Sequence, residues 1–136
     1  GRQDFMILLF SVMTMEQPYE HMPSRENLIG RNPTQETIDH YSLEKHVSAD
    51  TPPTFLVHTM GDTTVKEENE LMFYAALRKF NVPSEMHLFP VGPHGSGLGP
   101  REGDTNVWPA LCIEWLRFNG WIPDSDDSLM KKNFAR

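Results

Sequence analysis

The stretch Thr54-Phe55-Leu56-Val57-His58-Thr59, followed directly by Met60-Gly61-Asp62-Thr63-Thr64-Val65, decides the fold class of this chain. A short apolar run that follows Thr51-Pro52-Pro53 and ends in a glycine-containing turn is typical of a strand. A second such run, Glu85 to Phe89, ends in Gly92-Pro93-His94-Gly95. An acid therefore follows one predicted strand, and a histidine follows the next.

The sequence on either side of these runs completes an α/β pattern. Residues 66–80 and 107–118 repeat apolar positions with the period of amphipathic helices. Asp4 to Phe10 is apolar after its first residue, which indicates a strand covered on both faces. Residues 16–50 are polar and form a cap-like excursion after this first strand. Three short helices are expected there, over residues 25–29 with Ser24 as the cap, over 33–40 and over 42–46.

This order of elements predicts about three parallel strands with flanking helices, connected by right-handed crossovers. At 136 residues, the chain is expected to form one partial domain over residues 1–136. Residues 121–136 are polar and are expected to form a C-terminal tail.

Composition excludes several classes of function. The net charge is −7 and Lys and Arg do not cluster, which argues against a nucleic-acid partner. No apolar run is long enough for a transmembrane helix, so no membrane partner is expected. Cys112 is the single cysteine, which rules out an intrachain disulfide and a cysteine-based metal site. Because the chain begins Gly1-Arg2 rather than with Met, its compartment stays open.

Asp62 and His94 are the candidate catalytic residues. Neighbouring parallel strands lie roughly 5 Å apart, and loops that leave their carboxyl ends can meet. A serine nucleophile needs a base such as imidazole, and a carboxylate on the other ring nitrogen fixes the tautomer. However, no G-x-S-x-G nucleophile motif occurs anywhere in the chain.

Simpler interpretations of these residues stay open at this stage. Asp62 alone is a natural turn or helix-cap residue, and His94 could be an ordinary loop residue. His58 and His87 lie within predicted strands and are expected to be packed or surface histidines. A metal site built from His58, Asp62 and His94 has no recognised spacing, and neither a metal nor a cofactor is expected. Ser96 lacks a strand-turn-helix setting, and the glycines beside it suit a tight loop behind His94.

Several stretches together resemble a known family. They are Asp4-Phe5-Met6, Ser24 to Gly30, Thr51 to Thr59, Gly61 to Val65, Gly92 to Gly99, and Trp115-Leu116. The chain resembles the C-terminal portion of a bacterial α/β-hydrolase of the acetyl-xylan-esterase-like group, whose members are labelled lipase/esterase or xylanase. The resemblance implies that Asp62 is the triad acid and His94 the triad base. It also implies that the nucleophile and the oxyanion donors lie upstream of residue 4. Lys66 departs from the family, in which proline is common at this position.

Three functional hypotheses follow. In the first, the intact protein is a serine carboxylesterase that acts on acylated small molecules or carbohydrates, and this chain alone is inactive. In the second, the chain is a non-catalytic, truncated or degenerate hydrolase. It would be stabilised as a homodimer, a higher homo-oligomer or a complex with a complementary N-terminal half through the edge of the first strand. In the third, the fold serves a dienelactone hydrolase or a prolyl-oligopeptidase-type peptidase, although Ser24 to Gly30 favours the esterase group.

Overall fold

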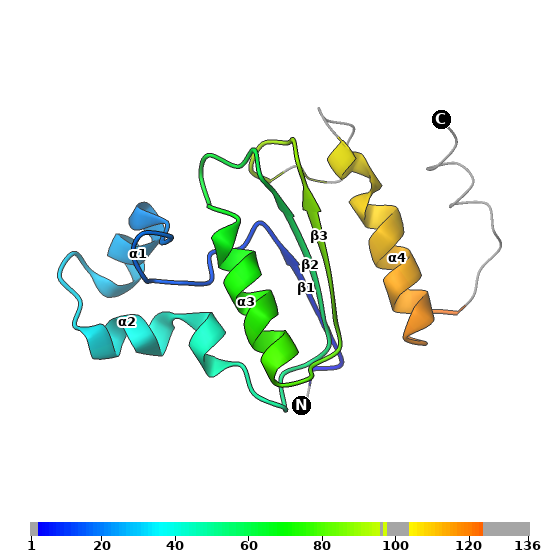
Figure 1. Ribbon diagram of the computed structural model, residues 1–136, viewed down its shortest axis with the longest axis horizontal. Coiled ribbons are helices and arrows are strands. Elements are labelled where there is room, and N and C mark those ends of the chain that lie inside the picture. The colour runs from blue at the N-terminus through cyan, green and yellow to red at the C-terminus, as the bar shows by residue number, and fades with distance from the viewer. Residues whose placement is uncertain (1–2, 96, 98–103, 124–136) are drawn as a thin grey trace.

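A three-stranded parallel sheet forms the centre of the structure, with strand order β1-β2-β3 (Figure 1). The computed structural model describes residues 3–95, 97 and 104–123. In chain order its elements are β1 (Met6–Leu9), α1 (Met22–Ile29), α2 (Gln35–Tyr41), the 3-10 helix η1 (Leu43–His46), β2 (Thr54–Thr59), α3 (Glu68–Lys79), β3 (Ser84–Phe89), the 3-10 helix η2 (Asp104–Val107) and α4 (Trp108–Phe118). The predicted α/β class and the three parallel strands are confirmed.

The sheet lies between two helices, with α3 on one face and α4 on the other (Figure 1). Successive side chains of β2 point to opposite faces. Leu56 therefore packs with Phe73 and Leu77 of α3, while Phe55 packs with Trp115 of α4. Every residue of β2 is buried, which explains why its sequence is apolar without alternation.

The segment between β1 and β2 carries α1, α2 and η1 and lies beside α3 (Figure 1). The three short helices are present where the sequence predicts them, but their starts differ. Thr34 caps α2, because its side chain accepts a hydrogen bond from the Thr37 N–H. In α1 the prediction that Ser24 caps the helix is wrong. The helix begins at Met22 with proline in its first turn, and the Ser24 hydroxyl instead contacts His21 Nδ1 at 2.8 Å.

Strand β1 is the most exposed strand of the sheet. Ile7 pairs with Phe55 and Leu9 with Val57, which places both β1 residues on the α4 face. Yet Ile7 is 37% exposed and Leu9 is 36% exposed. Among the described residues, nothing covers them fully, so this face of the apolar strand is only partly covered.

The loops after β2 and β3 are fastened to each other. The Met60 N–H donates to the Phe89 carbonyl at 2.8 Å, and the Thr59 hydroxyl donates to the Gly92 carbonyl at 2.8 Å. A Cβ atom added to Gly61 would lie 2.9 Å from the Gly92 oxygen, so this approach requires glycine. These contacts thus hold the loops after β2 and β3, which carry Asp62 and His94, in a fixed position relative to each other.

In the part of the chain that the structure describes, no helix has the length and apolar character needed to cross a membrane. Of the predicted tail over residues 121–136, residues 124–136 lie outside the described residues.

Candidate active site

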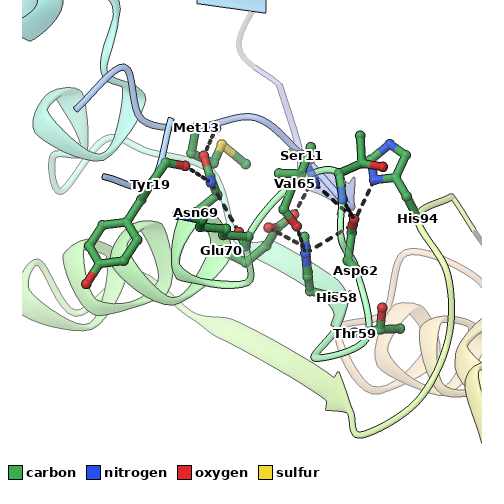
Figure 2. A network of polar contacts seen from close by, with 12 residues as sticks. Ser11, Met13, Tyr19, His58, Thr59, Asp62, Val65, Asn69, Glu70 and His94 are labelled. Carbon is green, nitrogen blue, oxygen red and sulfur yellow. Dashed lines mark hydrogen bonds and ion pairs between the residues drawn. The ribbon is translucent and has the colours of Figure 1, made fainter. Parts of the chain in front are cut away.

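The structure brings Asp62 and His94 into direct contact, as their positions after neighbouring strands predict. His94 Nδ1 lies 2.7 Å from Asp62 Oδ2 (Figure 2). The Asp62 side chain is fully buried, whereas the His94 side chain is 40% exposed. The pair therefore joins a shielded carboxylate to an imidazole that solvent or a ligand can reach.

The backbone of its own loop holds the Asp62 carboxylate in place. Asp62 Oδ1 accepts hydrogen bonds from the Thr64 N–H at 2.8 Å and the Val65 N–H at 2.9 Å. Burial alone would raise the pKa of Asp62, but the Val65 N–H, His94 and the Thr64 N–H together lower this pKa below its usual value. Asp62 is therefore a carboxylate at neutral pH.

The ionised state of Asp62 sets the tautomer of His94. A carboxylate only accepts hydrogen bonds, so the Nδ1–H of His94 must donate to Asp62 Oδ2. The other ring nitrogen, Nε2, points away from Asp62 (Figure 2). In this tautomer Nε2 carries a lone pair and can accept a proton.

His58 is the third residue of the site, and the sequence predicts only that it is a packed or surface histidine. Its side chain is fully buried. His58 Nε2 donates to the Val65 carbonyl at 2.8 Å and lies 3.3 Å from Asp62 Oδ2. On its other side, His58 Nδ1 lies 2.7 Å from Glu70 Oε2. Two carboxylates and two imidazoles therefore alternate in the order Glu70, His58, Asp62, His94 (Figure 2).

Glu70 and Asn69 are functional candidates that the sequence interpretation misses. Both side chains come from the first turn of α3 and are fully buried. Glu70 Oε1 accepts from the Ser11 N–H. Glu70 falls on the apolar stripe of Phe73 and Leu77, and a carboxylate at such a position is the signal that could have identified it.

Asn69 fastens the loop after β1 to α3. Its Oδ1 accepts from the Met13 N–H at 2.8 Å and the Thr14 N–H at 3.1 Å. Its Nδ2 donates to the Tyr19 carbonyl at 2.8 Å and the Lys66 carbonyl at 3.1 Å. One amide therefore satisfies four backbone groups around the site (Figure 2).

Phe10 completes the wall of the site from the end of β1. Its backbone has a φ of 53°, a conformation that non-glycine residues adopt uncommonly. The ring centroid lies 5.5 Å from that of His58 and 5.8 Å from that of His94. This aromatic ring shields the contact between the two imidazoles and Asp62.

The remaining candidates stand apart from this site. His87 pairs with Glu85 at 2.7 Å on β3 and packs against Phe55. Cys112 is buried, and burial raises the pKa of its thiol to about 11, so the thiol stays protonated. Within residues 3–95, 97 and 104–123, no cluster of His, Cys, Asp and Glu is arranged to hold a metal ion. Ser96 lies outside the described residues.

Comparisons with known proteins agree with this architecture. The model of the Prolyl oligopeptidase family matches residues 5–117. The chain is 42% identical over 95 residues to an endo-1,4-beta-xylanase B of Butyrivibrio fibrisolvens, covering 70% of this chain and 15% of that protein. It is 28% identical over 102 residues to an acetylxylan esterase of Xylanibacter ruminicola, covering 72% of this chain and 21% of that protein.

A solved structure extends the likeness to the fold. An acetyl ester-xyloside bifunctional hydrolase from Caldicellulosiruptor lactoaceticus superposes with a TM-score of 0.84 and 38% identity, covering 88% of this chain and 44% of that chain. The chain thus spans less than half the length of each of these relatives. The three-stranded sheet is part of an α/β-hydrolase fold, and the resemblance to the acetyl-xylan-esterase-like group is confirmed. The chain belongs to the prolyl oligopeptidase family of hydrolases.

Proposed function

We propose that this chain supplies the acid and the base of a serine carboxylesterase that removes acetyl or other short acyl groups from carbohydrates or small molecules. His94 is the general base and then the general acid, and Asp62 is the carboxylate that orients it. The observation that carries the proposal is the 2.7 Å contact between His94 Nδ1 and Asp62 Oδ2, with the imidazole half-exposed and the carboxylate buried.

The chemistry of this pair suits acyl transfer. A serine hydroxyl positioned at His94 Nε2 would lose its proton to the ring as it attacks an ester carbonyl. The imidazolium formed in that step is stabilised by the Asp62 carboxylate. The same proton then passes to the departing alcohol, and a water molecule repeats the sequence to release the acid.

The nucleophile has to come from outside residues 1–136. No G-x-S-x-G motif is present in the chain, and we propose that the serine and the oxyanion donors belong to a preceding segment. Residues 16–50 form a cap-like excursion of the same partial domain in this proposal. An acetylated carbohydrate is the preferred substrate class, because a relative of this chain is named acetylxylan esterase and another is named an acetyl ester-xyloside bifunctional hydrolase.

The experiment compares two preparations on a nitrophenyl acetate. The polypeptide of residues 1–136 should show little or no turnover, because a triad loses most of its catalysis without the nucleophile. A longer protein, in which this chain follows the segment encoded directly upstream of it, should turn over the ester. It should lose that activity on His94→Ala. Turnover by residues 1–136 that survives His94→Ala would contradict the assignment. Turnover of a peptide but not an ester by the longer protein would favour a peptidase.

The second candidate function is non-catalytic, and the exposure of β1 favours it. Ile7 and Leu9 form an apolar strip on an edge strand, and such an edge pairs readily with another strand. In this alternative the chain is a degenerate or truncated hydrolase that is stabilised as a homo-oligomer or by a complementary N-terminal half. A monodisperse monomer in light scattering at micromolar concentration counts against self-association.

A further inference from the structure

We infer that His58, held by Glu70, is a positioning residue for the Asp62–His94 pair, because its ring N–H competes with His94 for the same carboxylate oxygen. The inference rests on the proposed function in one respect only, namely that His94 is the base whose proton affinity matters. The competition itself is a property of the described residues.

The protonation of His58 follows from its partners. The Val65 carbonyl can only accept, so His58 Nε2 carries a hydrogen. The 2.7 Å contact between His58 Nδ1 and Glu70 Oε2 then holds one further proton. Burial alone would lower the pKa of His58, but Glu70, the Val65 carbonyl and Asp62 together raise this pKa above its usual value. The His58–Glu70 contact therefore shares one proton, and the raised pKa of His58 favours the place of that proton on the imidazole ring.

The position of the His58 ring decides its effect on His94. His58 Nε2 and His94 Nδ1 approach Asp62 Oδ2 at 3.3 Å and 2.7 Å, so the two nitrogens lie no more than about 6 Å apart. The His58 ring lies between Glu70 and His94, so its positive charge is nearer to His94 than the Glu70 carboxylate that compensates it, and part of the repulsion between the two rings remains.

The groups around the two rings leave few other sources for this effect. Among the described residues, the titratable partners of His58 are Glu70 from α3 and Asp62 from the loop after β2. His94 contacts Asp62 as its titratable partner. Phe10, from the end of β1, packs beside both rings and carries no charge.

The variant Glu70→Gln isolates the charge. Glu70 Oε1 accepts from the Ser11 N–H and Oε2 faces His58 Nδ1. A glutamine can keep both contacts, with its oxygen toward Ser11 and its amide N–H donating to the ring. His58 then becomes neutral while Nε2–H still faces Val65 and Asp62. We expect the pKa of His94 to rise, because the positive charge lost from His58 is nearer to His94 than the negative charge lost from Glu70.

The measurement is a pH titration of the imidazole resonances of residues 1–136 by NMR. Glu85→Gln is the matched control, because it removes the partner of another 2.7 Å histidine pair, that of His87, on β3. Glu85→Gln should leave the pKa of His94 unchanged. An unchanged pKa of His94 in folded Glu70→Gln would overturn the inference.

A second measurement needs no variant, which covers the case in which Glu70→Gln does not fold. The ring nitrogens of His58 in the unaltered chain should both be protonated at pH 7. A neutral His58 at pH 7, whichever ring nitrogen lacks its proton, would also overturn the inference. Neither readout depends on esterase activity, so failure of the proposed function is seen separately in the ester assay. In the longer, active protein, Glu70→Gln should move the acid limb of the kcat/KM profile to higher pH, by the same shift as the pKa of His94.

Discussion

At the scale of single residues, Asp62 makes contacts through both of its carboxylate oxygens, and each oxygen has different partners. Oδ1 is held by two backbone N–H groups, and Oδ2 faces both imidazoles. The sequence predicts the meeting of Asp62 with His94, because each follows the end of a parallel strand. It does not predict Glu70 or the charge of His58, because that pairing arises only when α3 packs on β2.

Asp62→Asn should reverse the tautomer of His94. The asparagine oxygen can still accept from the Thr64 and Val65 N–H groups, so its amide N–H would face the ring. His94 Nδ1 must then accept this hydrogen bond, and the ring proton moves to Nε2. Nε2 can then no longer accept the proton of the serine hydroxyl. We expect kcat in the longer, serine-containing protein to fall by about 10⁴, because the ring then presents the wrong tautomer to the serine.

Asp39→Asn is the control for that change, because Asp39 pairs with Lys45 on the surface of α2 and η1. Its ester turnover should match that of the parent. If Asp62→Asn keeps more than a tenth of the parent kcat, Asp62 is not the orienting acid.

The two perturbed groups of the site predict a bell-shaped dependence of stability on pH. The folded-state pKa of His58 is raised above about 6.5, so its stabilisation is present below that pH and is lost as pH rises through the folded pKa. The folded-state pKa of Asp62 is lowered below 3.8, so its stabilisation is present above that pH and is lost as pH falls through the folded pKa. Urea denaturation of residues 1–136 across pH 3 to 10 measures both limbs.

Glu70→Gln supplies the comparison for the alkaline limb. Without the Glu70 carboxylate, His58 loses the partner that raises its pKa, and the fall in stability above neutral pH should flatten. Equal alkaline limbs in the parent and in Glu70→Gln would show that the pair does not contribute to stability.

At the scale of elements, the helices and strands are largely predictable and their ends are not. The buried run at β2 and the amphipathic period of α3 are strong local signals. The start of α1 has no such signal, because the Ser24 side chain contacts His21 rather than the helix backbone. The exposure of Ile7 and Leu9 is equally invisible to the sequence, because it depends on where α4 lies on the sheet.

Asn69→Ala should destabilise the connection between β1 and α3. It leaves the buried N–H groups of Met13 and Thr14 without their acceptor. We expect a loss of about 2–4 kcal/mol in the free energy of unfolding. Asn27→Ala, at an exposed position of α1, should change it by less than about 0.5 kcal/mol. Equal effects of the two changes would remove Asn69 from this role.

Gly61→Ala should separate the loops after β2 and β3. The new Cβ would meet the backbone of Gly92 at 2.9 Å, and a backbone atom cannot swing away as a side chain does. We expect a loss of about 1–3 kcal/mol in the free energy of unfolding, together with altered His94 resonances. Gly30→Ala meets no atom within 4 Å but has a φ of 80°, so it should lower stability and leave the His94 resonances unchanged.

At the scale of the whole molecule, the α/β class and the parallel order follow from the pattern of the chain. What covers the β1 edge does not follow from that pattern, because none of the described residues fully covers Ile7 and Leu9. In the proposed site, likewise, this chain supplies the acid and the base, and we assign the nucleophilic serine to another segment. In the proposed function, the described residues thus supply an acid and a base close to a strand that is only partly covered.

Leu9→Lys should weaken any association through β1. The charge would enter the apolar strip, where Leu9 is 36% exposed, and would have to lose its hydration on pairing. We expect the apparent mass of residues 1–136 in light scattering to fall toward that of a monomer. Leu28→Lys, at a 55% exposed position of α1, should leave the mass unchanged. Equal masses for all three proteins would exclude association through β1.

The aromatic packing around α4 gives the molecule an optical probe of one face. All three tryptophans of the chain, Trp108, Trp115 and Trp121, belong to α4 or directly follow it. Trp115 and Trp121 pack around Phe5, with ring centroids 6.0 Å and 4.8 Å from it. Tryptophan fluorescence, excited selectively over that of tyrosines such as Tyr74 of α3, therefore reports the docking of α4, so separation of this layer from the sheet can be followed without any added dye.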